Sequence, residues 1–390
     1  MENCLFAAQG CGGCSLLATP YETQLLQKQA RVDELLTPFC VTEPIIGMET
    51  PYHYRNKAIL SFAPLPHSRR FASGIYAAGS HRLVPVTDCL LQDARLTEVL
   101  QKAAEAAANC HLPAWDEDRE AGLLRHMVAR RGVKTGEISL AVVTAEAVFP
   151  GSRDFTKAVT KACPDIVTVV QNINTRKTSA VLGDTEKVLF GKGFLTDELC
   201  GSRFQISTRA FYQVNPVQTE KLYALALEYA GLTGKETVLD AYCGIGTIAL
   251  TAAKKAKSVA GVELSADAVR NARHNARMNG IENAVFACGD AGEALEGAAN
   301  AGERFDVVFL DPPREGASEQ FLASLDRAAP KRAVYVSCNP ETLARDLSFL
   351  KKRGWHVLRA RPVDMFPHTE HVETCVLLSH KNPQTSPPSL

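Results

Sequence analysis

Three side chains in the second half of the chain could perform group-transfer chemistry. Cys338 follows a strand-like apolar run and lies two residues before Pro340, where the chain must turn. Asp311 ends a second run of the same design, and Glu373 begins the last apolar run of the chain. A thiolate is a strong nucleophile, and a carboxylate can accept a proton. The pattern predicts one active site in which Cys338 is the nucleophile.

A glycine-containing loop upstream of these residues predicts a cofactor site. The segment 240–247, Asp-Ala-Tyr-Cys-Gly-Ile-Gly-Thr, lies between an expected strand and an expected helix. Glycines at such a turn allow a ligand to approach the backbone and the helix N-terminus. Glu263 ends the next expected strand, where an acid can hold the hydroxyls of a ribose. Asp290 ends the strand after that, close to where an adenine edge would lie.

Two cofactors compete for this loop, a dinucleotide and S-adenosylmethionine. The loop contains Gly244 and Gly246 but lacks the third glycine of the dinucleotide fingerprint. It also begins with Asp240, which suits a cationic methionine end better than a pyrophosphate. The sequence therefore favours S-adenosylmethionine.

The residues after the strands indicate which atom receives the methyl group. Asp-Pro-Pro also occurs in enzymes that methylate exocyclic amino groups, but there an aromatic residue usually follows, and here Arg314 follows. Carbon methylation of a pyrimidine needs a cysteine, because C5 of uracil is a poor nucleophile until a thiolate adds to C6. A base must then remove the C5 proton, and Glu373, with His371 nearby in sequence, is the candidate. Asp311 could hydrogen-bond the target base or the amino group of the cofactor. Singly, such residues are more often packing or surface residues, but together they match one mechanism.

The elements that must position these residues alternate between strand and helix from residue 211 onward. This alternation predicts a mostly parallel sheet with helices on both faces. The expected strands are 237–240, 258–264, 284–287, 305–311, 333–337, 357–363 and 373–378. The expected helices are 218–229, 247–256, 266–278, 318–328 and 343–352.

The first half of the chain predicts an α+β domain, because strands and helices mix there without strict alternation. Helices are expected at 21–36 and 94–109 and near 154–162, with strands at 123–128, 137–144, 166–172 and 202–207. The region 51–90 is turn-rich, with strand-like runs at 54–62, 74–76 and 81–86, and basic and aromatic residues interleave in it. They suit phosphate contacts and base stacking, although a solvated sheet face would look the same. They are Tyr52, Tyr54, Arg55, Lys57, Arg69, Arg70, Tyr76, His81 and Arg82.

Four of the twelve cysteines have the pattern of a metal site. Cys4 precedes the Cys11-Gly-Gly-Cys14 motif, and Cys89 is a plausible fourth ligand. Four thiolates suit an iron–sulfur cluster or a structural zinc ion. The alternative is that Cys4 and Cys89 are ordinary core residues. The spacing differs from the CxxxCxxC of radical enzymes, which is unfavourable to radical chemistry.

Composition limits the class of protein. The 390 residues suffice for two domains, and 46% apolar with 22% charged residues is ordinary for a globular chain. No apolar run is long enough for a membrane span, and the N-terminus lacks a signal-peptide layout, so we expect a cytoplasmic protein without membrane contact. The net charge is zero, so RNA binding must come from local basic clusters. Residues 381–390 predict a disordered tail.

Taken together, the motifs closely resemble the RNA uracil-C5 methyltransferase family over nearly the whole chain. The matching segments are Cys4 with 11–14, 54–57, 211–215, 240–247, 311–316, 337–346 and 364–373. The resemblance implies a class I (Rossmann-like) methyltransferase domain at 208–380, preceded by a smaller α+β RNA-binding domain at 1–207.

The resemblance also implies the roles of individual residues. Cys338 would be the nucleophile and Glu373 the proton acceptor, while Phe211 would help order the base. The resemblance assigns four residues to the cofactor site: Gln213, Tyr242, Glu263 and Asp311. The sequence pattern adds Gly244, from the glycine loop, and Asp290, from the end of a strand. A structural 4Fe-4S cluster would be held by Cys4, Cys11, Cys14 and Cys89.

The RNA substrate is less sharply defined. Many family members carry an additional N-terminal β-barrel module, whereas here the cysteine motif starts at residue 4. This resembles the short branch that methylates large-subunit (23S) ribosomal RNA, and we expect a monomer that acts on one flipped uridine. The alternatives are a transfer-RNA (uracil-5-)-methyltransferase and a non-catalytic iron–sulfur RNA-binding factor.

Overall fold

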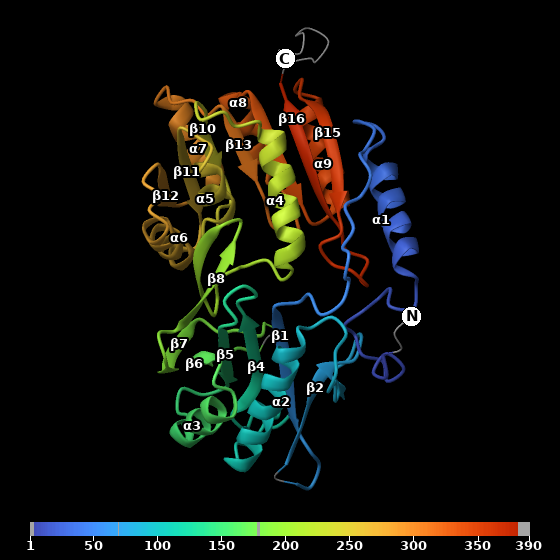
Figure 1. Cartoon of the computed structure of the whole chain (residues 1–390), viewed down its shortest axis with the longest axis vertical. Helices are drawn as coiled ribbons and strands as arrows, with labels where there is room; N and C mark the ends of the chain where they lie inside the picture. The colour runs from blue at the N-terminus through green and yellow to red at the C-terminus, as the bar shows by residue number, and fades with distance from the viewer. Residues whose placement is uncertain (1–3, 69, 178–179, 381–390) are drawn as a thin grey trace.

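The computed structural model describes residues 4–68, 70–177 and 180–380. Figure 1 shows two lobes, one around each of two sheets. The upper lobe holds the second sheet in the chain, and the lower lobe holds the first. The helix α1 (Tyr21–Leu36) lies beside the upper lobe although it comes first in the chain.

The second sheet is parallel except at one edge. Its strand order is β12-β11-β10-β13-β14-β16-β15, and only β16 runs antiparallel to its neighbours. Both faces are covered, which explains why these strands are nearly continuous apolar runs. The strands are β10 (Thr237–Asp240), β11 (Ser258–Glu263), β12 (Ala284–Cys288), β13 (Val307–Leu310), β14 (Arg332–Ser337), β15 (His356–Val363) and β16 (Glu373–Ser379).

Helices pack on both faces of this sheet, and most begin at a capping side chain. Ser265, Asp290, Ser318 and Asn339 each accept hydrogen bonds from the first turn of the helix that follows. The carboxyl ends of the strands therefore lead directly into capped helix starts. The helices are α4 (Pro216–Ala230), α5 (Thr247–Ala253), α6 (Ala266–Met278), α7 (Ala291–Asn300), α8 (Glu319–Ala328) and α9 (Pro340–Lys351).

The first sheet is mixed and mostly antiparallel, with the order β3-β2-β1-β4-β5-β6-β7. Helices α2 (Ala94–Asn109) and α3 (Ser152–Ala162) cover one of its faces and close a separate core. The strands are β1 (Lys57–Pro64), β2 (Phe71–Tyr76), β3 (Leu83–Val84), β4 (Leu124–Arg131), β5 (Ile138–Thr144), β6 (Ile166–Ile173) and β7 (Thr185–Phe190).

Two elements from the first half of the chain pack with the second sheet. Val32 and Leu36 of α1 belong to the core between that sheet and α8 and α9. The hairpin of β8 (Phe194–Leu199) and β9 (Ser202–Ser207) joins the core on the opposite face. The division between residues 207 and 208 stays a prediction, and these two elements cross it.

The predicted mostly parallel sheet is confirmed, and several predicted bounds agree with the structure to the residue. Those of α1, α2, α6, β9 and β10 do so. The prediction missed β7, whose side chains are mostly exposed, β8, and α7, which is rich in alanine and glycine. β7 and α7 lack the apolar periodicity on which such predictions depend, and in β8 the buried position 197 is an aspartate, which breaks the apolar alternation. The predicted tail at 381–390 lies outside the described residues, and in the described chain no helix has the length and apolar character to cross a membrane.

Candidate active site

The pairing of two strands brings Cys338 and Glu373 together. β14 pairs antiparallel with β16, and Ser337 lies opposite Thr374. The next pair outward in this register is Cys338 with Glu373. The negative charge of Glu373 acts on the thiol and raises its pKa, in agreement with this proximity.

Asp311 reaches the same edge from the neighbouring strand. β13 runs parallel to β14, with Leu310 opposite Tyr335, so Asp311 leaves the sheet beside the end of β14. Its charge also acts on both Cys338 and Glu373. The three residues that the sequence predicts at separate strand ends therefore form one cluster.

The surroundings of Cys338 favour its thiol over its thiolate. Burial, then Glu373, then Asp311 raise its pKa to about 11. Arg314 opposes this shift, as does a backbone N–H at Cys338 itself. Cys338 also lies just before the first turn of α9, where the helix dipole favours a negative charge. The start of α9 and Arg314 therefore oppose the effect of the carboxyl groups on this thiol.

Glu373 is a buried acid, and one of its carboxyl oxygens has no hydrogen-bond partner among the described residues. Its side chain is 3% exposed, and the oxygen without such a partner is Oε2. Burial, followed by the nearby charge of Asp311, raises its pKa well above the ordinary value. A carboxyl group with a raised pKa and a free oxygen is suited to accept a proton from a bound substrate.

A narrow pocket beside this cluster contains four of the six predicted cofactor residues. Gln213, Tyr242, Gly244 and Asp311 line it, together with Asp240. The remaining lining residues are Phe211, Tyr212, Tyr223, Cys243, Ile245, Thr247 and Ile248.

Glu263 and Asp290, the other two predicted cofactor residues, do not line this pocket. Glu263 accepts hydrogen bonds from the backbone N–H groups of Gly244, at 3.2 Å, and Ser265, at 2.8 Å. Asp290 caps α7, and its charge raises the pKa of Tyr242. Their cofactor roles stay a prediction, and Glu263 is tied to the loop that lines the pocket.

Asp240 supplies a second buried acid to the pocket. Its Oδ2 accepts a hydrogen bond from the N–H of Ala249, and the backbone of Tyr242 also lowers the pKa of this carboxyl group. Burial raises its pKa to about 7, and the charges of Asp311 and Glu263 act in the same direction. Burial also raises the pKa of Asp311 to about 7. A pocket with surplus negative charge fits a cationic ligand, and the sulfonium and ammonium groups of S-adenosylmethionine meet this requirement.

Glycine is required at the turn of this loop. Gly244 and Gly246 have φ values of 52° and 89°, in the left-handed region that side chains rarely adopt. At Gly246 a Cβ atom would also approach Phe286 to 3.2 Å. The loop can therefore lie close to the pocket and pass directly into α5.

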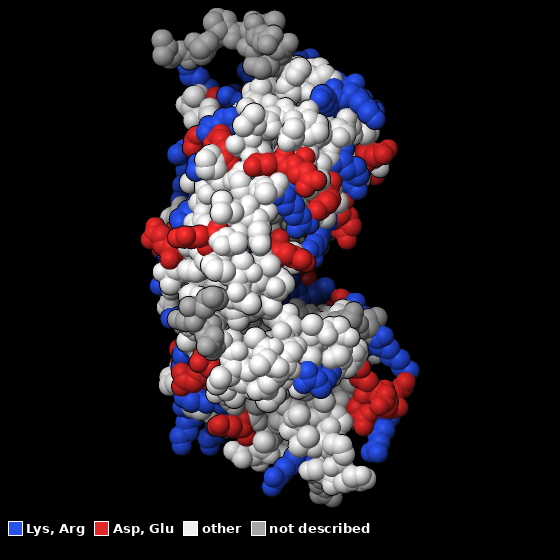
Figure 2. All heavy atoms as spheres, turned by 90° about the vertical axis from the view of Figure 1, so that its right-hand side faces the viewer, with Lys and Arg blue, Asp and Glu red and all other residues white. Residues whose placement is uncertain are grey.

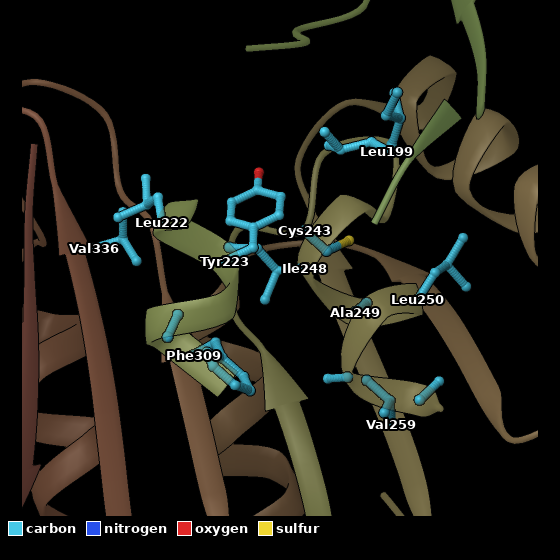
Figure 3. Close-up of a cluster of buried hydrophobic side chains, with 14 of the residues drawn as sticks. Leu199, Leu222, Tyr223, Cys243, Ile248, Ala249, Leu250, Val259, Phe309 and Val336 are labelled. Atoms are coloured by element: carbon cyan, nitrogen blue, oxygen red, sulfur yellow. The ribbon is translucent and has the colours of Figure 1, made fainter. Parts of the chain in front are cut away.

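Tyr223, which lies behind the pocket on α4, has no signal in the sequence pattern. Its hydroxyl group lies 3.0 Å from the Thr247 hydroxyl, and the charges of Asp311 and Asp240 raise its pKa after burial does. In Figure 3 the Tyr223 hydroxyl group points away from the apolar side chains of Ile248 and Phe309. This side chain joins the apolar core to the acidic pocket.

Side chains of α1 form an ion pair and hydrogen bonds with the loop before Glu373. Lys28 Nζ lies 2.6 Å from Asp364 Oδ1, and both side chains are buried. Tyr21 donates a hydrogen bond to the other oxygen of Asp364 at 2.8 Å. Gln24 accepts a hydrogen bond from the N–H of His368, and its amide nitrogen lies 3.0 Å from His368 Nδ1. We call residues 364–372 the base loop, because they deliver Glu373 to the sheet edge.

The cysteine-bearing segment also contacts the base loop. Leu16 N donates to the carbonyl oxygen of His368 at 3.0 Å, and Glu370 N donates to Ser15 Oγ at 3.1 Å. Tyr52 stacks on the ring of His368 with centroids 4.8 Å apart. His371, which is near Glu373 in sequence, lies 2.8 Å from Arg314 through its Nδ1.

Three of the four predicted metal ligands lie in two small apolar clusters that share Cys89. Cys14 and Cys89 share one small apolar cluster, and Cys11 and Cys89 share another. Burial raises the pKa of Cys11 and of Cys14, and the charges of Cys89 and Cys4 contribute to both shifts. Among residues 4–68, 70–177 and 180–380, however, no group of three or more His, Cys, Asp or Glu side chains is arranged to hold a metal ion. The ligand set stays a prediction.

The basic and aromatic residues predicted to contact RNA have different partners within the protein. Lys57 lies beside Arg130, whereas Arg82 donates to the carbonyl oxygen of Gln9. Tyr54 donates to the carbonyl oxygen of Pro367 and supports the base loop. Arg69 lies outside the described residues.

Comparison with known proteins agrees with this geometry. The model of the tRNA (uracil-5-)-methyltransferase family matches residues 181–381, more than half of the chain. An uncharacterized RNA methyltransferase of Halalkalibacterium halodurans is 42% identical over 380 residues, which cover 95% of this chain and 82% of the relative. One of Caldanaerobacter subterraneus is 41% identical over 375 residues, with the same two coverages.

A solved structure resembles both lobes. The Pyrococcus abyssi tRNA (uracil-54, C5)-methyltransferase, in complex with S-adenosyl-L-homocysteine, aligns with a TM-score of 0.77 and 27% identity. The alignment covers 95% of this chain and 86% of the Pyrococcus chain.

Proposed function

Because this chain belongs to the S-adenosylmethionine-dependent RNA (uracil-C5) methyltransferase family, we propose that it methylates C5 of a specific uridine in large-subunit (23S) ribosomal RNA. One observation carries the chemical part of the proposal. The thiol group of Cys338 and the carboxyl group of Glu373 lie at adjacent positions at the end of two paired strands, and these groups can serve as nucleophile and base. Carbon methylation of uracil requires these two functions on neighbouring atoms of the ring.

The reaction proceeds by addition and elimination at the base. The Cys338 thiolate forms a bond to C6, and the electrons of the C5–C6 double bond move toward C5 and the adjacent carbonyl group. Bound S-adenosylmethionine supplies an electrophilic methyl group for C5 and a positive charge beside the carboxyl groups. Glu373 then removes the C5 proton, the double bond re-forms, and the thiolate leaves.

The remaining residues act through position and charge. Asp240 and Asp311 provide the negative surface for the cationic cofactor, and Glu263 holds the loop at Gly244. Phe211 is 69% exposed at the pocket and can stack against the target base. Compensation of the carboxyl groups by bound ligands lowers the pKa of Cys338 toward the working range.

A variant of the nucleophile tests the chemistry. Cys338→Ala removes the sulfur atom, so transfer of a labelled methyl group to RNA should be lost while S-adenosylmethionine still binds. Cys110→Ala, in the other lobe, is the control and should keep its activity. RNA containing 5-fluorouridine should trap an adduct on the wild type, because fluorine blocks the proton removal. An adduct that forms equally on Cys338→Ala would refute the assignment.

The class of RNA is tested separately. The cysteine motif resembles that of the ribosomal branch, whereas the Pyrococcus neighbour acts on transfer RNA, which makes transfer RNA the second candidate. Both RNA classes, taken from a strain without the enzyme, would be offered together with labelled S-adenosylmethionine. 5-Methyluridine in large-subunit RNA alone is expected. Label confined to transfer RNA would establish the second candidate.

We also propose that Cys4, Cys11, Cys14 and Cys89 hold a 4Fe-4S cluster. All four are free thiols; Cys89 lies in one apolar cluster with Cys14 and in another with Cys11, and the charge of Cys4 acts on Cys11 and Cys14. A cluster there would fix the first residues against the sheet without taking part in methyl transfer. Anaerobically purified protein should contain about four iron atoms per chain, and Cys14→Ser should lose them. Bound zinc, or iron unaffected by Cys14→Ser, would contradict the proposal.

A further inference from the structure

Two cations, Lys57 and Arg130, lie on the face of the first sheet that α2 and α3 do not cover. In the register of β1 with β4, Lys57 lies opposite Arg130 and Ile59 lies opposite Val128. Directly opposite residues share a face, so these four side chains point the same way. Ile59 and Val128 belong to a small apolar cluster separate from the core under α2 and α3. Lys57 and Arg130 therefore lie on the face away from these helices.

This pair of cations has no acidic partner among the described residues. Arg130 is only 5% exposed; its Nη2 donates to the carbonyl oxygen of Ala210, and Nη1 has no partner within the described ranges. Neither Lys57 nor Arg130 forms an ion pair in residues 4–68, 70–177 and 180–380. Burial, and then the charge of Arg130, lower the pKa of Lys57 to about 8. Two neighbouring cations in a partly buried place are unfavourable unless an anion joins them.

The pair lies next to the segment that enters the cofactor pocket. Arg130 holds the carbonyl oxygen of Ala210, and Asn56 bonds to the carbonyl oxygens of Gln213 and Val214. The exposed ring of Phe211 lies within this segment and also lines the pocket. Figure 2 shows the molecule hollowed between its two lobes on one side, with Lys and Arg side chains in the hollow.

We propose that Lys57 and Arg130 form a seat for one backbone phosphate of the RNA substrate, beside the nucleotide that is methylated. The inference rests on the proposed function and deepens it, because it states how the RNA chain is held while its base enters the pocket. A phosphodiester supplies the missing negative charge, and the neighbouring Phe211 offers its ring to the base. Recognition at this seat is by charge and carries no sequence information.

The test measures RNA binding without catalysis. A short fluorescein-labelled single-stranded RNA with one uridine is titrated into wild type and Lys57→Gln at several salt concentrations. The variant should bind about tenfold more weakly, and the slope of log affinity against log salt should fall by about 0.7, the value for one phosphate of a single strand. Lys57→Arg should restore binding. Lys161→Gln, on α3 over the opposite face, should behave as the wild type.

Further measurements distinguish a phosphate seat from a structural role or a cofactor contact. Lys57→Gln should melt at or above the wild-type temperature, because it removes a charge that no acid in the described chain compensates. A methylphosphonate at the seated phosphate should weaken wild-type binding but not binding by Lys57→Gln. An unchanged salt slope, or a loss of S-adenosylhomocysteine affinity in the absence of RNA, would overturn the proposal, and the latter would assign the seat to the cofactor carboxylate. If the wild type binds this RNA but methylates no uridine, the proposed function fails while the seat is still tested.

Discussion

The carboxyl edge of the second sheet and the Lys57–Arg130 corner of the first sheet each bury charge of one sign. The sheet edge collects Asp240, Asp311 and Glu373, whose pKa values are raised because burial disfavours their charged forms and their charges repel one another. The corner collects two cations, whose pKa values burial lowers. The comparison indicates that each region has charge of one sign that the protein does not compensate and that a bound ligand of opposite charge would compensate.

A third buried charge shows what a purely structural arrangement looks like. Lys28 is as buried as the charges of the two regions, but Asp364 lies 2.6 Å away and Tyr21 completes the group. The charge is neutralised within the protein, and the pair fastens α1 to the base loop. A compensated charge should therefore support folding, whereas the uncompensated ones should support binding and catalysis at some expense of stability.

The largest effect is expected for Glu373→Gln at the sheet edge. The amide cannot remove the C5 proton, so the turnover rate should fall by about 10²- to 10⁴-fold. The bond from Cys338 to the methylated base should then persist with ordinary uridine and appear as a protein–RNA adduct on a denaturing gel. Stability should be unchanged or higher, because an unpartnered buried carboxyl group is removed. Glu370→Gln, exposed in the same loop, is the control, and a variant that turns over without accumulating adduct would exclude Glu373 as the base.

For the buried Lys28–Asp364 pair, a substitution should lower stability. Lys28→Met leaves Asp364 buried without its cation, so the free energy of unfolding should fall by about 3–5 kcal/mol. Arg31 lies on α1 like Lys28 and forms an exposed ion pair with Glu341 of α9. Arg31→Met breaks this pair and should lower the free energy of unfolding by less than about 1 kcal/mol. Denaturant unfolding measures both, and adding Asp364→Asn to Lys28→Met should recover part of the loss. Equal stability of Lys28→Met and wild type would remove the contrast between compensated and uncompensated charges.

A smaller effect is expected for Asp240→Asn at the cofactor pocket. The amide oxygen can still accept the hydrogen bond of Ala249, so the fold should be kept. Loss of the negative charge should weaken S-adenosylmethionine binding by about 10- to 100-fold, which corresponds to one charge-assisted contact. Calorimetric titration would measure this, with the exposed acid variant Glu282→Gln as the control. Unaltered affinity would mean that Asp240 serves only to hold α5.

Sequence reasoning found the catalytic and cofactor candidates because they follow strands in one sheet. Parallel strands end at a common edge, so Asp311 and Cys338 could be brought together from local patterns alone. Glu373 joined them through the antiparallel β16, whose apolar run was also visible. Gln213, Tyr242, Gly244 and Asp311 line one pocket, and their roles stay predictions.

The charge pairs could not be found in this way. Lys28 and Asp364 are 336 residues apart in sequence, and neither position has a local signal for its partner. Lys57 was noted only as one of many basic residues, because its isolation depends on the β1–β4 register. Tyr223 lies inside a predicted helix and reaches the pocket only through the packing of α4. Long-range packing, which periodicity does not encode, decided all of these.

The smallest effect concerns pH and applies to the wild type. Asp240 and Asp311 have raised pKa values near 7, and a cation binds their ionised forms. Affinity for S-adenosylmethionine should therefore rise with pH, by roughly eightfold from pH 6 to pH 7.5 if one group near 7 governs binding. The free protein should lose stability over the same range, because its folded state binds more protons than its unfolded state. Measurements below pH 7.5 avoid most of the titration of the cofactor's own amino group. In Asp240→Asn the affinity for S-adenosylmethionine should depend less on pH. An affinity that falls with rising pH in the wild type would show that the ionised carboxyl groups of Asp240 and Asp311 do not bind a cation.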